Sequence, residues 1–176
     1  MSEMPQFVYH PDPVATGSVV PSSEVCPACG AARGYAYALT PYAIGEHDHI
    51  CPWCIADGTA HAKFDATFVD DWPLQRADLP DSVVAEVTQR TPGYTSWQQE
   101  EWLSCCGDAC EFHGDAPQAE IRALDARGFE RLVPRPAFKF DEAPGFLRNY
   151  EPGGSPAFYK FVCRRCGGVQ YGWDCD

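Results

Sequence analysis

The spacing of the ten cysteines is the feature that most constrains this 176-residue chain. The first four cysteines form two Cys-x-x-Cys pairs, Cys26/Cys29 and Cys51/Cys54. Two thiolates three residues apart can hold one metal ion through a tight turn, and a second pair completes the tetrahedron of a structural zinc site. Gly30 fits because it permits the positive φ angle at which the backbone folds beneath the sulfurs. We therefore predict a first zinc site at these four cysteines.

The pair Cys51/Cys54 has a second interpretation. A lone Cys-x-x-Cys at the start of a helix can be a dithiol redox site, and a helix is expected here from Ile55 to Lys63. Redox chemistry does not explain a matching pair upstream at ribbon spacing, so zinc is favoured. Strand-like residues 35–39 lie between the pairs and complete a zinc-ribbon-like module over residues 26–64.

The later cysteines predict a second zinc site. Cys163 and Cys166 flank two arginines at the tip of an expected hairpin. Cys106 and Cys110 would share one face of a helix, because residues four apart are neighbours there. The second site is therefore expected at Cys106, Cys110, Cys163 and Cys166, with Cys105 or His113 as a substitute for one helix ligand. The alternative is that Cys105, Cys106 and Cys110 are buried as small apolar residues, and Cys175 has no expected role.

The helix carrying Cys106 is predicted from a capping-box pattern. Ser96 is followed three residues later by Gln99, the arrangement that satisfies the first N–H groups of a helix. Trp97 and Trp102, which follow the expected start, are predicted to be buried.

Two other helices are expected in the middle of the chain. Asp81 or Ser82 can cap one, which ends at Thr91-Pro92-Gly93. Asp115 is the expected N-cap of the next, and Gly128 its stop. Residues 134–156 are rich in proline and glycine and indicate an irregular loop.

These elements predict an α+β fold, small, compact and stabilised by zinc. It would contain a zinc-ribbon-like β-hairpin module, central helices and a C-terminal β-hairpin. We expect one domain over residues 1–176. Its parts are the module at 26–64, a helical middle at 82–128 and a zinc-knuckle hairpin at 157–176.

Composition restricts the partners and the location. Thirteen Lys and Arg against 25 Asp and Glu give a net charge of −12. Phosphate backbones and anionic membranes both attract basic proteins, so neither nucleic acid nor a membrane surface is an expected partner. The N-terminus has no basic and apolar segments of the kind that form a secretory signal, and no apolar run approaches the length of a membrane span. We expect a cytoplasmic protein.

Motifs for catalysis are missing. The chain has no nucleophile elbow, phosphate loop or dinucleotide fingerprint. A zinc ion held by four cysteines has no open coordination position for a substrate. His10, His61 and Asp57 could line a pocket, but lone histidines are more often packed or on the surface. The chain is therefore not expected to be an enzyme.

Several strings resemble the CbrC-like family of bacterial proteins over nearly the whole chain, although residues 115–155 match only loosely. They include Phe7-Val8-Tyr9-His10-Pro11-Asp12-Pro13, Cys26-Pro27-Ala28-Cys29-Gly30, Cys51-Pro52-Trp53-Cys54-Ile55-Ala56-Asp57-Gly58, Cys106-Gly107-Asp108-Ala109-Cys110 and Cys163-Arg164-Arg165-Cys166-Gly167. The resemblance implies tolerance of a DNA-degrading colicin and a role as an immunity protein against toxins. It implies no catalytic activity.

The acidic charge agrees with a protective binding role. Nuclease toxins are basic where they hold phosphate, so an acidic protein could bind that surface with fast, charge-driven association. Such a partner would be a protein, and the oligomeric state is left open. The candidate contact residues are Asp65, Phe68, Asp70, Asp71, Trp72, Asp78 and Asp81.

Two alternatives remain. A zinc-ribbon adaptor for nucleic acid or the ribosome would use Arg164 and Arg165 at the knuckle tip, and it predicts salt-dependent binding. A thiol redox or stress protein would need at least one cysteine pair with a low pKa that changes oxidation state without unfolding.

Overall fold

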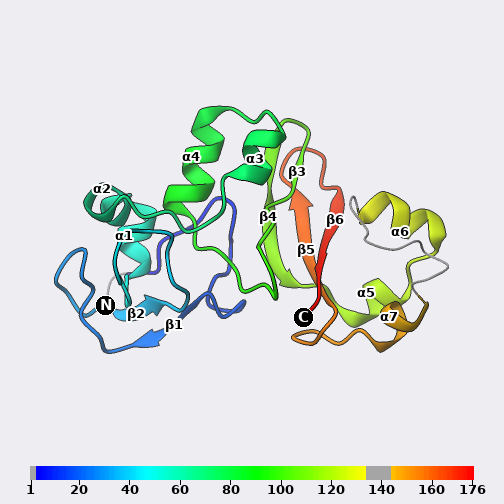
Figure 1. Cartoon of the computed structure of the whole chain (residues 1–176), viewed down its shortest axis with the longest axis horizontal. Helices are drawn as coiled ribbons and strands as arrows, with labels where there is room; N and C mark the ends of the chain where they lie inside the picture. Colours follow the sequence, from blue (N-terminus) through cyan, green and yellow to red (C-terminus); the bar gives the residue numbers. More distant parts are fainter. Residues whose placement is uncertain (1–2, 134–143) are drawn as a thin grey trace.

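The structure is a computed structural model that describes residues 3–133 and 144–176. Figure 1 shows an elongated molecule with a two-stranded ribbon and short helices at one end, an antiparallel sheet in the centre and further short helices at the other end. The mixed α+β class is confirmed, with an N-terminal hairpin, helices and C-terminal strands. Among the described residues, no helix has the length and apolar character needed to span a bilayer.

The N-terminal end is built on a two-stranded ribbon and two short helices. Strand β1 (Val19–Ser22) pairs antiparallel with β2 (Gly34–Tyr37). Helices α1 (Pro52–Ala56) and α2 (Thr59–Phe64) follow. The single helix expected from Ile55 to Lys63 is therefore divided, because Gly58 adopts a left-handed conformation between the two.

The next segment carries α3 (Trp72–Arg76) and α4 (Asp81–Arg90). Helix α4 ends before Thr91, as the sequence predicts, but neither Asp81 nor Ser82 caps it, because Pro80 is the N-cap and Asp81 is the first helical residue. The acidic side chain of Asp81 in its first turn is favourable because the helix N-terminus carries partial positive charge. Val87 and Thr88 lie on the buried face of α4.

A four-stranded antiparallel sheet forms the centre, with strand order β3-β4-β5-β6. Its strands are β3 (Ser104–Cys105), β4 (Asp108–Asp115), β5 (Ala157–Cys163) and β6 (Val169–Asp174). The predicted C-terminal hairpin is present as β5 and β6. Strand β4 adds to it through pairs such as Cys110 with Cys163.

The prediction of a helix after Ser96 is wrong. At the expected start of that helix, Gln98 donates its backbone N–H to the distant Asp174 carboxylate at 2.8 Å. The chain then forms the β3–β4 hairpin. Cys106 and Gly107 occupy its two-residue turn with φ angles of 54° and 71°, the positive values that a tight primed turn requires.

The prediction for Asp115 and Gly128 is also wrong in detail. Asp115 ends β4, and the helical part that follows is divided into α5 (Gln118–Arg122) and α6 (Ala126–Leu132). Asp125 caps α6 by accepting from the N–H of Gly128 at 2.7 Å, so Gly128 lies inside the helix. Within the expected loop, α7 (Pro144–Asn149) is helical, whereas residues 134–143 lie outside the described residues.

Within residues 3–133 and 144–176, three clusters of buried side chains hold these parts together. The first surrounds the N-terminal cysteines, the second lies between α4 and the sheet, and the third joins α5, α6 and α7 to β5 and β6. Trp102 is buried in the apolar core between α4 and the sheet, as predicted, whereas Trp97 is 50% exposed, contrary to prediction. The Trp97 indole instead lies at the surface and donates to the Gly154 carbonyl.

Candidate functional site

The first four predicted cysteines come together between the ribbon and α1. Cys26 and Cys29 lie in the loop that joins β1 to β2, while Cys51 precedes α1 and Cys54 lies within it. Their sulfur atoms all lie within 4.8 Å of one another. Gly30 has a φ of 71°, the left-handed conformation expected beneath a knuckle.

Backbone N–H groups prepare this cluster for a metal. Burial alone would raise the pKa of the Cys26 thiol, but N–H donors, led by that of Cys51, lower it to about 7. The Cys51 N–H lies 3.2 Å from the Cys26 sulfur. Burial raises the pKa of Cys51 to about 11 and that of Cys54 further still. A metal would therefore have to displace protons from these thiols, which makes its affinity fall at low pH.

The second cysteine cluster contains Cys105, Cys106, Cys163 and Cys166, whose sulfurs also lie within 4.8 Å of one another. Two turns at one end of the sheet bring them together. Cys105 ends β3 and Cys106 begins the following turn; Cys163 ends β5 and Cys166 lies in the turn before β6. The N–H of Cys166 donates to the Cys163 sulfur and lowers the pKa of that thiol to about 7.

One predicted ligand of the second cluster is corrected. Cys110 does not join it, because the segment is a strand and Cys110 is fully buried in the core. Cys105, named as a substitute, takes that place. His113 also lies outside the cluster and contacts Glu111 at 3.2 Å. Cys106-Gly107, followed by the alternation of apolar and polar residues over Cys110–His113, was the sequence signal for a hairpin.

The spacing of the sulfur atoms fits zinc. A tetrahedral ion with Zn–S bonds of about 2.3 Å places its ligands about 3.8 Å apart. The sulfurs of Cys29 and Cys51 are 3.9 Å apart, and Cys105 lies 3.7 Å from Cys106 and 4.0 Å from Cys166. Both donor sets are all-thiolate, which selects soft metals such as zinc. Each cluster could hold one such ion.

The clusters differ in exposure. In the first, three of the four cysteines are buried and only Cys29 is exposed. In the second, only Cys163 is buried, and both Cys106 and Cys166 are exposed. Solvent, chelators and oxidants therefore reach the second cluster more easily.

The two arginines beside the second cysteine cluster form ion pairs with carboxylates of the same chain. Asp108, which is buried, accepts from the Tyr9 hydroxyl at 2.8 Å and contacts Arg164 at 3.5 Å and Arg165 at 3.7 Å. The Arg164 guanidinium also stacks over the Tyr9 ring and contacts Glu111. The carboxylates of Asp108 and Glu111 balance the positive charge of these arginines, which argues against phosphate binding by the pair.

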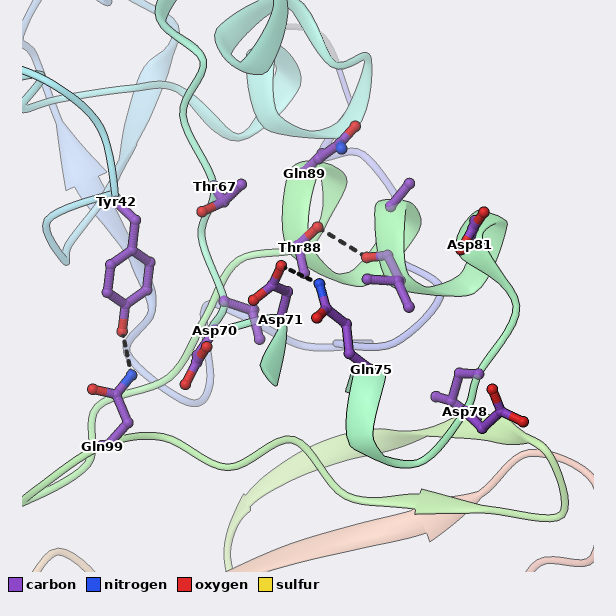
Figure 2. Close-up of a pocket in the computed structure, with 14 residues that line it drawn as sticks. Tyr42, Thr67, Asp70, Asp71, Gln75, Asp78, Asp81, Thr88, Gln89 and Gln99 are labelled. Carbon is purple, nitrogen blue, oxygen red and sulfur yellow. Dashed lines mark hydrogen bonds between the residues drawn. The ribbon is translucent and has the colours of Figure 1, made fainter. Parts of the chain in front are cut away.

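An open cleft of about 890 Å³ lies between α3, α4 and the segment before α3. Four aspartates line it, and no lysine or arginine is among its lining residues. Figure 2 shows these carboxylates arranged around the opening, with Tyr42 and Gln99 on the opposite side from Asp81. The aspartates are Asp70, Asp71, Asp78 and Asp81.

Three other predicted contact residues do not line this cleft. Phe68 is 1% exposed and packs in the core around the first cluster, so it cannot anchor a partner. Asp65 is exposed at the end of α2 and is not a lining residue. Trp72 is 62% exposed and adjoins the cleft in sequence.

The histidines considered for a pocket make structural hydrogen bonds. His10 is fully buried between the Pro92 carbonyl and the Thr16 hydroxyl. His61 contacts the Ala66 carbonyl at 3.0 Å, and Asp57 accepts from the N–H of Thr59.

Comparisons with known proteins give one consistent family. A UPF0167 protein of Pseudomonas aeruginosa is 47% identical over 97% of this chain and 97% of its own length. UPF0167 proteins of Mycobacterium bovis and Mycobacterium tuberculosis are each 45% identical over 94% of this chain and 90% of theirs. No solved structure matches this fold. The profile of UPF0167, described as an uncharacterised protein family, matches residues 4–175, and the chain therefore belongs to that family.

Proposed function

We propose that this protein is a non-enzymatic binding protein, stabilised by two zinc ions, that confers tolerance to a bacterial nuclease toxin by binding it. The observation that supports a structural role for the metal is the pair of complete four-cysteine clusters. Four thiolates fill the coordination of zinc, so neither ion would have an open position for a substrate. Zinc would instead supply cross-links between turns that are far apart in sequence.

The two clusters would act on different parts of the scaffold. The first ties the β1–β2 loop to α1, and the second ties the β3–β4 turn to the β5–β6 turn. The acidic cleft is lined by residues of α3, α4 and the segments beside them. A basic toxin surface would meet four carboxylates there without a competing cation from the cleft wall. The resemblance to CbrC-like proteins supports the choice of a toxin as partner.

The proposal is tested in the host bacterium. Deleting the gene should lower survival by at least about tenfold during exposure to a DNA-degrading toxin from competing strains, and the intact gene should restore it. Purified protein should also inhibit DNA cleavage by that toxin while leaving an unrelated nuclease unaffected. Equal survival with and without the gene, across a panel of such toxins, would contradict the proposal.

A thiol redox role is the second candidate, and the exposure of Cys106 and Cys166 favours it. It predicts a cysteine pair that oxidises and is reduced again while the fold is retained. The structural role predicts the reverse, namely thiols that are masked until metal is removed. Thiol titration of the native protein, before and after chelation, separates the two.

A further inference from the structure

We propose that the acidic cleft binds a basic amphipathic segment of a protein partner, with an apolar side chain against its floor and Lys or Arg side chains against its rim. This inference deepens the proposed function, since it names the surface and the chemistry of the segment that the protein would bind.

The floor of the cleft is apolar. Val69 and Leu79 are buried there, and Val84 and Ala85 of α4 are partly exposed along the same wall. The volume of about 890 Å³ is near the upper end of the usual range for ligand pockets, roughly 300–1,000 Å³. The cleft is also open to solvent. It therefore has room for several side chains of an approaching segment.

The rim of the cleft carries two pairs of aspartates, which differ in their hydrogen bonds within the described residues. Asp70 and Asp71 are held in place: Asp70 accepts from the N–H of Trp72, and Asp71 accepts from the Gln75 amide. Asp78 and Asp81 have no hydrogen-bond or ion-pair partner for their carboxylates within the described part of the chain. They are available to cations of a partner, whose charge would pair with theirs at little cost in rearrangement.

The buried Glu100 carboxylate orders the wall of the cleft that contains Tyr42 and Asp70. Glu100 is 9% exposed, and its carboxylate accepts from the Tyr42 hydroxyl at 2.7 Å and from the N–H of Asp70 at 3.1 Å. Gln99 donates to the Tyr42 hydroxyl. These contacts hold Tyr42 and Asp70 where Figure 2 shows them, so this wall is already ordered before a partner arrives.

The arrangement favours distributed cations over a single metal ion. The four aspartates do not gather within ligand distance of one another, and among the described residues only the two cysteine clusters do so. Lys and Arg side chains spaced along a segment can reach separate carboxylates, while an apolar residue between them fills the floor. This is the pattern by which amphipathic helices bind grooves.

The test measures binding of a fluorescent peptide by anisotropy. The probe is a helical peptide of about 18 residues with one lysine face and one leucine face, and its counterpart carries glutamate in place of lysine. Binding of the lysine peptide is expected and should weaken as salt rises, and the glutamate peptide should not bind. Equal binding of both peptides would overturn the proposal.

Variants locate the binding. D78N/D81N removes two rim charges, and asparagine tolerates the left-handed φ of 54° at position 78. We expect this variant to weaken binding by about tenfold or more. The control E46Q/E130Q removes the same charge from exposed positions outside the cleft and should change binding by less than about twofold. Equal weakening by both variants would show attraction to net charge alone and overturn the site.

Three further outcomes test this inference, and the last two separate it from the proposed function. If the protein is a dimer that D78N/D81N converts to monomer, a second copy occupies the cleft and the inference fails. If D78N/D81N loses peptide binding but keeps full toxin tolerance, the cleft is not the surface used for tolerance, although the tolerance function stands. If the peptide result holds and tolerance is absent, the function fails and the cleft stands.

Discussion

His10 gives a prediction whose size can be worked out from the structure. Its ring is fully buried and packs edge-on against Phe112, with ring centres 5.0 Å apart. The Pro92 carbonyl can only accept, so Nδ1 donates to it at 2.8 Å and Nε2 accepts from the Thr16 hydroxyl at 2.7 Å. Burial lowers the pKa of His10 from 6.5 to about 4, so the imidazole is neutral at pH 7 and carries its proton on Nδ1.

The sign follows from proton binding. Between pH 6.5 and 4 the unfolded chain binds a proton at His10 that the folded chain does not, so stability falls as the pH falls through this range. The lowering of this pKa from 6.5 to about 4 corresponds to about 3.4 kcal/mol when complete. By pH 5.5 the expected loss is about 1.4 kcal/mol, because the unfolded histidine is by then mostly protonated.

The assay is urea unfolding of the wild type and of H10Q at pH 7.5 and pH 5.5. Glutamine can donate to the Pro92 carbonyl and accept from the Thr16 hydroxyl but does not titrate. H10Q should therefore lose about 1.4 kcal/mol less than the wild type over this interval. Acid also weakens metal binding, and since His10 is in neither cluster that loss is common to both proteins. Identical pH dependence of the two proteins would refute the reasoning.

Three other predictions follow from burial and contacts. With excess chelator, metal release measured by a colorimetric zinc indicator should show two phases. The fast phase should come from the more exposed second cluster and be absent in C105S; its persistence there would contradict the assignment. W102A should lower the free energy of unfolding by about 3–5 kcal/mol in urea, because Trp102 is 1% exposed and donates to the Cys110 carbonyl. W97A, at a half-exposed position, should lower it by about 1 kcal/mol or less, and equal losses would be inconsistent with the packing. D108N should cost about 2 kcal/mol in the same assay, since it weakens the contacts of Tyr9, Arg164 and Arg165 with one buried carboxylate; a loss no greater than that of D65N would argue against this.

The first cluster could be predicted because its signal is local. Each Cys-x-x-Cys pair sets its own turn, and Gly30 supplies the φ angle that the turn needs. The only distant requirement is that two such turns meet.

The second cluster depends on which turn type forms around Cys106. The spacing of Cys106 and Cys110 fits a helix, but Gly107 with Cys106 forms a hairpin turn that places Cys105 beside Cys166 instead. Ser96 and Gln99 match a helix cap in sequence, whereas in the fold Gln98 between them is bound to Asp174 of β6. Such tertiary partners lie outside any local pattern.

The acidic cleft was only partly visible in the sequence. The aspartates between residues 70 and 81 indicate a charged face, yet their spacing does not show that α3 and α4 place them around an apolar floor. Phe68 illustrates the limit, because an aromatic residue within an acidic stretch can equally be a core residue, as it is here.

Zinc content tests the central claim most directly. Native mass spectrometry of untagged protein should show two zinc ions per chain. C54S and C105S should each retain one ion, while C110A should retain both and lose only about 1–2 kcal/mol of stability from its buried sulfur. One zinc or none in the wild type, or loss of an ion in C110A but not in C105S, would contradict the account.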